Sequence, residues 1–169
     1  MMNIYTYIAA SFKHKHGVRL LGQNMRDLGF TLLDWTEKAV PPPRLTPIER
    51  RPWMDTDSEG GTVFSFCRDA CMNAQLLVYY GASGQDAGVE IGMAHATGIP
   101  VLGIRGPLEG PGLMLHGAVD CWTENIEEAL VLLGKVAAHA KEACKHLPEE
   151  RDARVRLLCK RIDASTKKV

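Results

Sequence analysis

The chain has 169 residues, of which 46% are hydrophobic and 24% are charged, a balance typical of a globular protein with one core. Twenty Lys and Arg residues match twenty Asp and Glu residues, so the formal net charge is zero. This balance argues against general electrostatic binding to nucleic acid or to an acidic membrane surface. We therefore expect a soluble protein whose partners include neither a nucleic acid nor a membrane.

The cysteines and the apolar runs indicate where the protein resides. Five cysteines, an odd number with no Cys-x-x-Cys pair, predict free thiols in an intracellular chain. No apolar run approaches the ~20 residues that span a bilayer, and no signal peptide precedes the first strand-like segment. No histidine lies at zinc-like spacing near Cys67 and Cys71. We expect a cytoplasmic protein without a metal site.

The N-terminal elements follow from apolar periodicity. Residues 3–10, NIYTYIAA, predict a buried strand rich in aromatic and β-branched side chains. Apolar residues then recur at helical spacing from Val18 to Leu28, and Gly29 is placed to end that helix. Residues 30–35, FTLLDW, predict a second strand.

A proline-rich segment over residues 36–62 separates these elements from the rest of the chain. It holds five prolines, followed by Gly60 and Gly61. A long irregular segment in a compact domain is usually functional or disordered. Trp53 lies inside it and is a candidate lid over a ligand, with a loop anchor as the alternative.

The remaining chain alternates between strand and helix patterns. Asn125 and Glu128 fit a capping box at the start of the last long amphipathic helix. We divide the chain into an α/β domain over residues 1–147 and a charged helical extension over 148–169. The predicted elements are helix 63–74, strand 75–80, helix 87–97, strands 100–104 and 118–122, a helix from residue 126, and helix 149–164.

Alternating strands and helices predict a single-domain, doubly wound, flavodoxin- or Rossmann-like five-stranded parallel sheet with helices on both faces. In such sheets ligands bind at the carboxyl ends of the strands. The two loops of interest are therefore Ala10–Gly17, after the first strand, and Gly81–Gly88, after the third.

Glu90 is the candidate centre of any chemistry. If Ser83 or Asp86 caps the helix, Glu90 lies one turn beyond Asp86 on the same face. The helix N-terminus favours an ionised carboxylate, whereas the charge of Asp86 opposes double ionisation. Such a pair can supply a carboxylate nucleophile and a proton-handling partner.

The same pattern has a plain structural interpretation. Acidic residues in the first turn of a helix stabilise it by ~0.3–1 kcal/mol without any catalytic role. Gly84, Gly88 and Gly92 either admit a ligand close to the backbone or allow the helix to pack closely on the sheet. Their spacing is not G-x-G-x-x-G, so a dinucleotide-binding motif is not indicated.

Two stretches, YIAASF and LLVYYGASGQDAGVEIGMAHATGIPVLGI, resemble the nucleoside 2-deoxyribosyltransferase superfamily, which includes nucleotide N-glycosidases. Tyr7 matches the family's active-site tyrosine, and Glu90 matches the catalytic glutamate that attacks the anomeric carbon. The resemblance runs in order over about residues 4–122 and is specific around 76–104.

The resemblance implies cleavage or transfer of an N-glycosidic bond in a nucleoside or nucleotide, without any cofactor. Tyr7 would orient Glu90, and Asp86 or Asp69 would assist proton transfer to the leaving base. Ser11 and Lys13 resemble the phosphate contacts of the nucleotide-hydrolysing branch. The expected substrate contacts are Ala10, Ser11, Phe12, Lys13, Trp53, Gly81, Ser83, Gly84, Gly88 and Met114.

Relatives complete each site with residues from a neighbouring subunit, and GLMLHG at 112–117 lies where that contribution resembles the family's. The resemblance thus implies a homodimer or larger homo-oligomer.

Three positions depart from the family pattern: Cys67 and Gln75 replace acidic residues, and Asp86 replaces a common glycine. They motivate an alternative function, a nucleotide-binding sensor or adaptor without turnover. Hydrolysis of NAD at its nicotinamide bond is an enzymatic alternative, because it uses similar glutamate chemistry. Transferase and hydrolase activity differ only in what attacks the intermediate, and both stay open.

Overall fold

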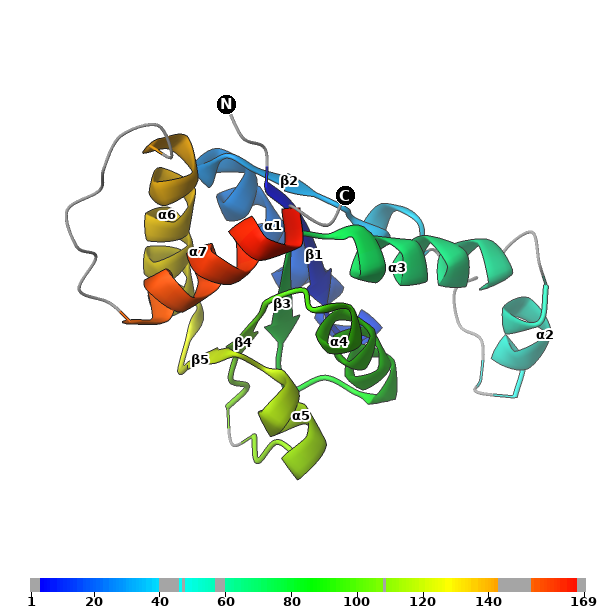
Figure 1. Cartoon of the computed structure of the whole chain (residues 1–169). Helices are drawn as coiled ribbons and strands as arrows, with labels where there is room; N and C mark the ends of the chain where they lie inside the picture. The colour runs from blue at the N-terminus through cyan, green and yellow to red at the C-terminus, as the bar shows by residue number, and fades with distance from the viewer. Residues whose placement is uncertain are drawn as a thin grey trace.

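The computed structural model describes residues 4–39, 46, 48–56, 60–107, 109–142 and 153–166. They contain a five-stranded, all-parallel sheet with strand order β2-β1-β3-β4-β5 (Figure 1). This confirms the predicted α/β fold with a parallel five-stranded sheet. The strands are β1 (Ile4–Ala9), β2 (Phe30–Leu32), β3 (Leu76–Tyr80), β4 (Val101–Ile104) and β5 (Cys121–Thr123).

The strands are mostly apolar and mostly buried because both faces of the sheet are covered, as parallel sheets require. β3 lies in the middle of the sheet, and β1 pairs with it, so that Tyr7 is opposite Leu77 and Ile8 is opposite Val78. Side chains alternate between the two faces along a strand. Tyr7 and Ile8 are both buried, and they therefore serve opposite faces.

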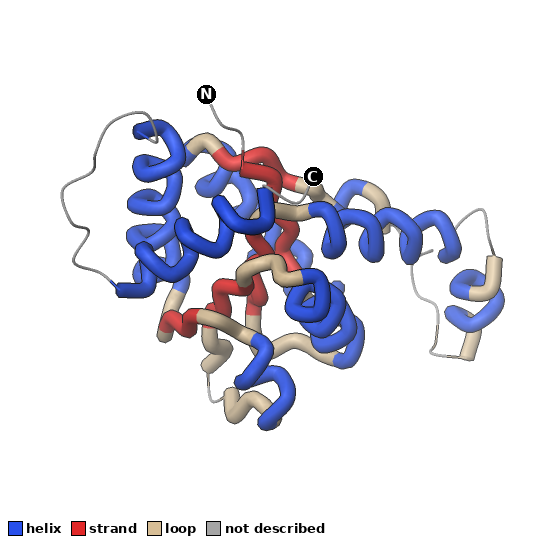
Figure 2. Tube along the Cα trace, viewed as in Figure 1, coloured by secondary structure: helices blue, strands red, loops and turns tan. Residues whose placement is uncertain are grey.

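Helices cover both faces, as the blue tubes around the red strands in Figure 2 show. α1 and α6 pack together over one face, and α3 and α4 pack over the other, with α5 beside α4. A short helix, α2, lies beyond the start of α3 and away from the sheet (Figure 1). The helices are α1 (Lys15–Leu28), α2 (Arg50–Met54), α3 (Thr62–Asn73), α4 (Gln85–Thr97), α5 (Leu113–Ala118), α6 (Ile126–Glu142) and α7 (Ala153–Thr166), with short 3-10 turns η1 (Phe12–His14) and η2 (Trp35–Glu37).

α7 packs against α6 and adds Val155, Leu158 and Ile162 to the common hydrophobic core. Arg161 on α7 forms an ion pair with Asp120, which precedes β5, and so ties the helix to the edge of the sheet. None of the helices in the described ranges is long and apolar enough to cross a bilayer.

Several predicted boundaries agree with the structure. Gly29 ends α1 with a left-handed φ of 100°, a conformation that favours glycine. The Asn125 side chain accepts the Glu128 N–H at 2.8 Å, while the Glu128 carboxylate accepts the N–H of Glu124 rather than that of Asn125. One hydrogen bond of the predicted capping box is therefore present, and the other is made to the N–H of the preceding residue, Glu124.

Other predictions were wrong. β2 ends at Leu32, because the Asp34 carboxylate accepts the Thr36 N–H at 2.9 Å and begins η2. Neither Ser83 nor Asp86 caps α4; Gly84 precedes the helix without a side-chain cap. The segment at 113–117, where the sequence indicated no helix, is part of α5. Pro41 to Pro43, Pro47, Cys144 and Pro148 lie outside the described residues.

Candidate active site

The centre of the site is a hydrogen bond between Tyr7 and Glu90. Tyr7 extends from β1 under α4, is fully buried, and donates its hydroxyl to Glu90 Oε1 at 2.6 Å. Glu90 lies in the second turn of α4, close to the carboxyl ends of the central strands. Its other oxygen, Oε2, is buried and has no hydrogen-bond partner among the described residues. A buried carboxylate oxygen without a partner is costly, so this atom is available for a ligand.

The surroundings of Glu90 raise its proton affinity. Burial raises the pKa of the Glu90 carboxyl to about 7, the Tyr7 hydrogen bond opposes that shift, and the negative charge of Asp86 adds to it. Burial, followed by the Glu90 charge and the Cys67 thiol, raises the pKa of Tyr7 far above its ordinary value. Tyr7 therefore acts as a permanent hydrogen-bond donor, and Glu90 changes its charge near neutral pH.

Two thiols from α3 complete the wall around this pair. Cys67 is half-buried and interacts with both the Tyr7 hydroxyl and Glu90, and Cys71 behind it is fully buried. Burial is the main cause that raises the pKa of Cys67 to about 11, and it raises the pKa of Cys71 further still. Both thiols are uncharged at neutral pH.

Asp69, predicted to assist proton transfer, does not join this group. It lies on the outer face of α3, where its side chain is 59% exposed and pairs with Arg68 at 2.8 Å. The reason is helical spacing: Cys67 and Cys71 are four residues apart and share the inner face, which leaves Asp69 outside. Asp86, by contrast, is an exposed residue of the first turn of α4 and is close enough to influence Glu90.

The two predicted loops meet beside the pair. The Ser11 N–H donates to Ser83 Oγ at 2.9 Å, and this hydroxyl donates in turn to the Tyr80 carbonyl at 2.5 Å. The His14 ring forms a hydrogen bond with the Ala82 carbonyl at 2.8 Å. The β1–α1 and β3–α4 loops are thus joined through side chains, as expected for loops at the carboxyl ends of neighbouring parallel strands. His14 was not among the predicted site residues.

A third loop, after β4, is attached through Glu109, which the sequence did not single out. The Tyr79 hydroxyl donates to Glu109 Oε1 and accepts the Ser83 N–H at 3.0 Å, while Glu109 Oε2 accepts the Gly106 N–H at 2.8 Å. A Cβ at Gly106 would lie 2.2 Å from the Ala82 nitrogen, so only glycine permits this contact between the loops. Glu109 is an isolated acid in a glycine- and proline-rich stretch, and no local sequence pattern indicates its role.

Gly84 just before α4 and Gly88 and Gly92 within it face open space. Apart from neighbouring residues and the backbone of the helix itself, a Cβ added at any of them would meet no described atom within 4 Å. Close packing of α4 on the sheet therefore does not explain them. They remain compatible with close approach of a ligand or of another chain.

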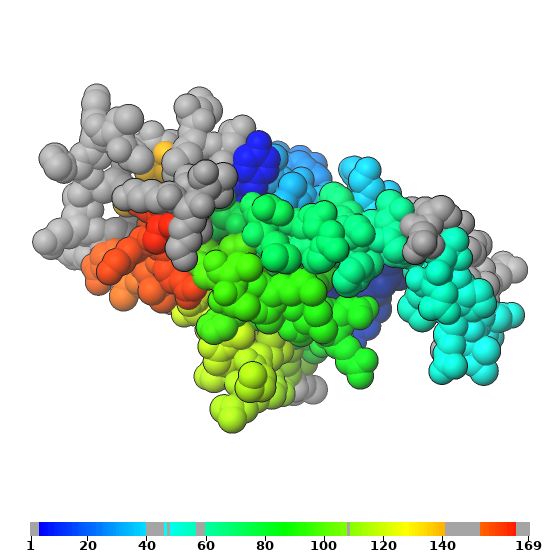
Figure 3. Space-filling view, turned by 45° about the vertical axis from the view of Figure 1, so that its right-hand side comes forward, coloured from blue at the N-terminus to red at the C-terminus, as the bar shows by residue number. Residues whose placement is uncertain are grey.

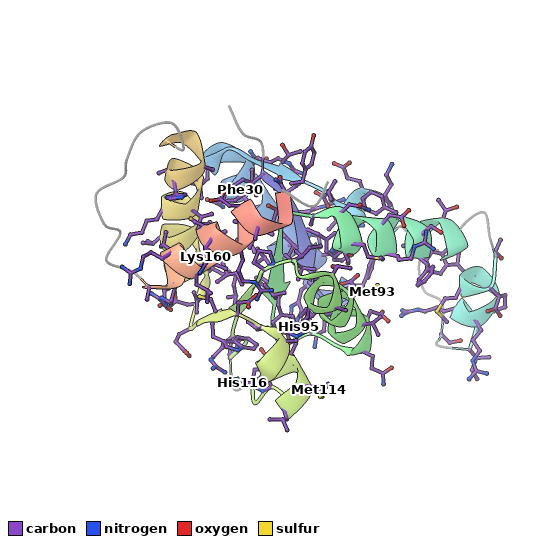
Figure 4. The ribbon with its side chains drawn as sticks, viewed as in Figure 1. Phe30, Met93, His95, Met114, His116 and Lys160 are labelled. Carbon is purple, nitrogen blue, oxygen red and sulfur yellow. The ribbon has the colours of Figure 1, made fainter. Side chains whose placement is uncertain are left out.

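The other predicted substrate contacts are spread over several elements around the Tyr7–Glu90 pair. Ala10 and Gly81 are buried at the strand ends, whereas Phe12 and Lys13 are exposed on η1. Trp53 lies on α2, beyond α3, and is not brought to Glu90 in this arrangement. Met114 is 86% exposed on α5, the projecting helix labelled at Met114 and His116 in Figure 4. In the space-filling view of Figure 3, α5 also projects from the body of the protein.

Solved structures with a similar fold include two enzymes. The 2-deoxyribosyltransferase of Bacillus psychrosaccharolyticus is 21% identical, with a TM-score of 0.57, over 75% of this chain and 90% of that chain. The CMP N-glycosidase of Clostridium botulinum is 16% identical, with a TM-score of 0.50, over 76% of this chain and 97% of that chain. No protein-family model and no curated protein sequence matches the chain. The chain therefore shares its α/β fold with these two enzymes, in agreement with the resemblance in sequence.

Proposed function

We propose that this protein is an enzyme that cleaves or transfers the N-glycosidic bond of a nucleoside or nucleotide, with Glu90 as the nucleophile. The observation that carries the proposal is the Tyr7–Glu90 pair, in which one carboxylate oxygen lies 2.6 Å from the Tyr7 hydroxyl and the other is buried without a partner among the described residues. The fold shared with a 2-deoxyribosyltransferase and a CMP N-glycosidase supports the same class of reaction.

In the proposed reaction, Tyr7 fixes Oε1 of Glu90 and leaves Oε2 to attack C1′ of the sugar. The bond between C1′ and the base breaks, and a glycosyl ester with Glu90 forms. Water or a second base then attacks C1′ and restores the carboxylate. In this proposal Asp86, whose negative charge acts on Glu90, accepts a proton from the attacking water.

The joined loops beside Glu90 provide the proposed binding surface for the substrate. Ser11 and Ser83 fix the β1–α1 loop against the β3–α4 loop, and Lys13 on η1 supplies a positive charge for a 5′-phosphate. The open glycine face at Gly84 and Gly88 leaves room for the sugar or base next to α4.

A panel assay tests the proposal. Purified protein is incubated with ribo- and deoxyribonucleosides and their 5′-monophosphates, including both neutral and cationic bases, and free base is measured by chromatography. We expect release from at least one member, and exchange of the base when a second free base is added would indicate transfer. If a known glycosidase releases base under the same conditions and this protein releases none from any member, the proposed function is wrong.

We also propose a homodimer or larger homo-oligomer. Leu113 and Met114 are adjacent on α5 and each 86% exposed, and contiguous exposed apolar side chains favour an interface. We expect a mass of at least two chains by light scattering at micromolar concentration. Leu113→Asp together with Met114→Asp should shift the mass to one chain, whereas Val131→Asp, on the exposed side of α6, should not. A single-chain mass for the unmodified protein would contradict the proposal.

A further inference from the structure

The groups around Glu90 differ from those expected for a site that protonates a leaving base. Within the part of the chain that the structure describes, the side chains that act on the Tyr7–Glu90 pair from the packed elements are Cys67 and Cys71 of α3 and Asp86 of α4. The Asp69 carboxylate faces away and pairs with Arg68. α3 therefore presents two uncharged thiols to the Glu90 site, at the place where a proton donor to the leaving base would have to lie.

Neither remaining neighbour is suited to donate a proton to a base. Buried thiols are weak acids, and the pKa of Cys67 is raised to about 11, mainly by burial. Asp86 raises the pKa of Glu90 through its negative charge, and a charged carboxylate accepts protons rather than donating them. Tyr7 already donates its hydroxyl proton to Glu90 Oε1.

We infer that the substrate is a nucleoside or nucleotide whose base is joined to C1′ through a positively charged ring nitrogen, as in a pyridinium nucleoside. The inference rests on the proposed function and narrows its substrate class. A base of this kind leaves without receiving a proton, which suits a site whose facing groups are two thiols and a second carboxylate. The unpartnered, buried Oε2 of Glu90 is the atom that the cationic ring and its C1′ would approach.

The step balances without an acid. Oε2 of Glu90 forms a bond to C1′, and the electron pair of the C1′–N bond returns to the ring nitrogen, which loses its positive charge. The base departs neutral, and the carboxylate charge is consumed in the ester. Water then attacks C1′, the ester oxygen leaves as carboxylate, and one proton of the water passes to solvent through Asp86.

The positive charge also prepares the nucleophile. An opposite charge near a carboxyl group favours the ionised form. Binding of a cationic base next to Glu90 and Asp86 therefore converts Glu90 to the carboxylate. When a neutral base binds, part of the Glu90 population stays protonated near pH 7. The two carboxylates on one face of α4 attract the same cation.

Base release from nicotinamide riboside, compared with adenosine, cytidine and thymidine at pH 7, tests the inference. We expect kcat/KM for nicotinamide riboside to exceed that for each neutral nucleoside by about 100-fold or more. A neutral nucleoside cleaved as fast as the cationic one would overturn the inference and leave the proposed function standing. Release from none of the four, and from none of the panel described above, would overturn both.

A pair of variants tests the role of charge directly. Asp86→Asn should raise KM for nicotinamide riboside by about tenfold, because one of the two charges that attract the cation is lost. Asp69→Asn makes the same chemical change on the outer face of α3 and should leave KM within about twofold. Equal KM values for Asp86→Asn and the unmodified protein would contradict the inference.

Discussion

Glu90→Gln is expected to reduce turnover of the glycosidic substrate by at least ~10³-fold, equivalent to about 4 kcal/mol of barrier. The amide keeps the shape of the side chain and can still accept the Tyr7 hydrogen bond, but it lacks the negative charge that attacks C1′. The substrate should still bind, since the loops joined through Ser11 and Ser83 are unchanged, although a cationic base loses the attraction of the Glu90 charge. Single-turnover measurements of base release, together with the melting temperature, check this expectation.

Glu127→Gln is the matched control. Glu127 is an exposed glutamate in the first turn of α6, on the opposite face of the sheet, and its replacement makes the same chemical change. Its turnover should equal that of the unmodified protein. If Glu90→Gln retains activity within about tenfold, only ~1.4 kcal/mol of barrier is lost, and Glu90 is not the nucleophile.

The unfolding free energy should fall as the pH rises from about 4.5 to 7, and Glu90→Gln should remove much of that fall. The Glu90 pKa rises from 4.5 to about 7 on folding, so the folded chain holds a proton that the unfolded chain releases. The contribution is complete below the unfolded value and is lost as the pH passes the folded value. Its size is about 3 kcal/mol.

Denaturant unfolding at pH 5, 6, 7 and 8 measures this effect for the unmodified protein and for Glu90→Gln. All other titrating groups are common to the two chains, so the difference between the curves isolates Glu90. The variant should gain stability relative to the unmodified protein between pH 5 and pH 8. Parallel curves would mean that Glu90 titrates normally, with its carboxyl in contact with water.

The sheet could be predicted from the sequence because its strands are short, apolar and bounded by turn residues. β1, β3 and β4 agree with prediction to within about two residues, a normal uncertainty for element ends. β2 was predicted three residues too long, because tryptophan, here Trp35, is a residue type that is common in strands. Its indole N–H instead donates to the Ile8 carbonyl at 2.8 Å, a tertiary contact that local sequence does not reveal.

Some residues of the site could be predicted from the sequence and others could not. Tyr7 and Glu90 were paired through the family resemblance, and the structure brings them within 2.6 Å. Spacing along α3 could have excluded Asp69, because residues two positions apart on a helix point in different directions. Glu109 and His14 act through loop-to-loop contacts, which depend on how β1, β3 and β4 are ordered and leave no periodic signal in the chain.

The position of β1 between β2 and β3 has a consequence for how this chain folds during synthesis. β1 pairs with β2 nearby in the chain but also with β3, so its second edge stays open until residues 76–80 have emerged. An open edge of this kind is prone to pairing with other chains. Tyr7 and Glu90 are 83 positions apart, so their contact forms only after long-range closure of the sheet. A high contact order of this kind slows folding relative to a helical bundle of similar length and prolongs the period in which β1 is exposed.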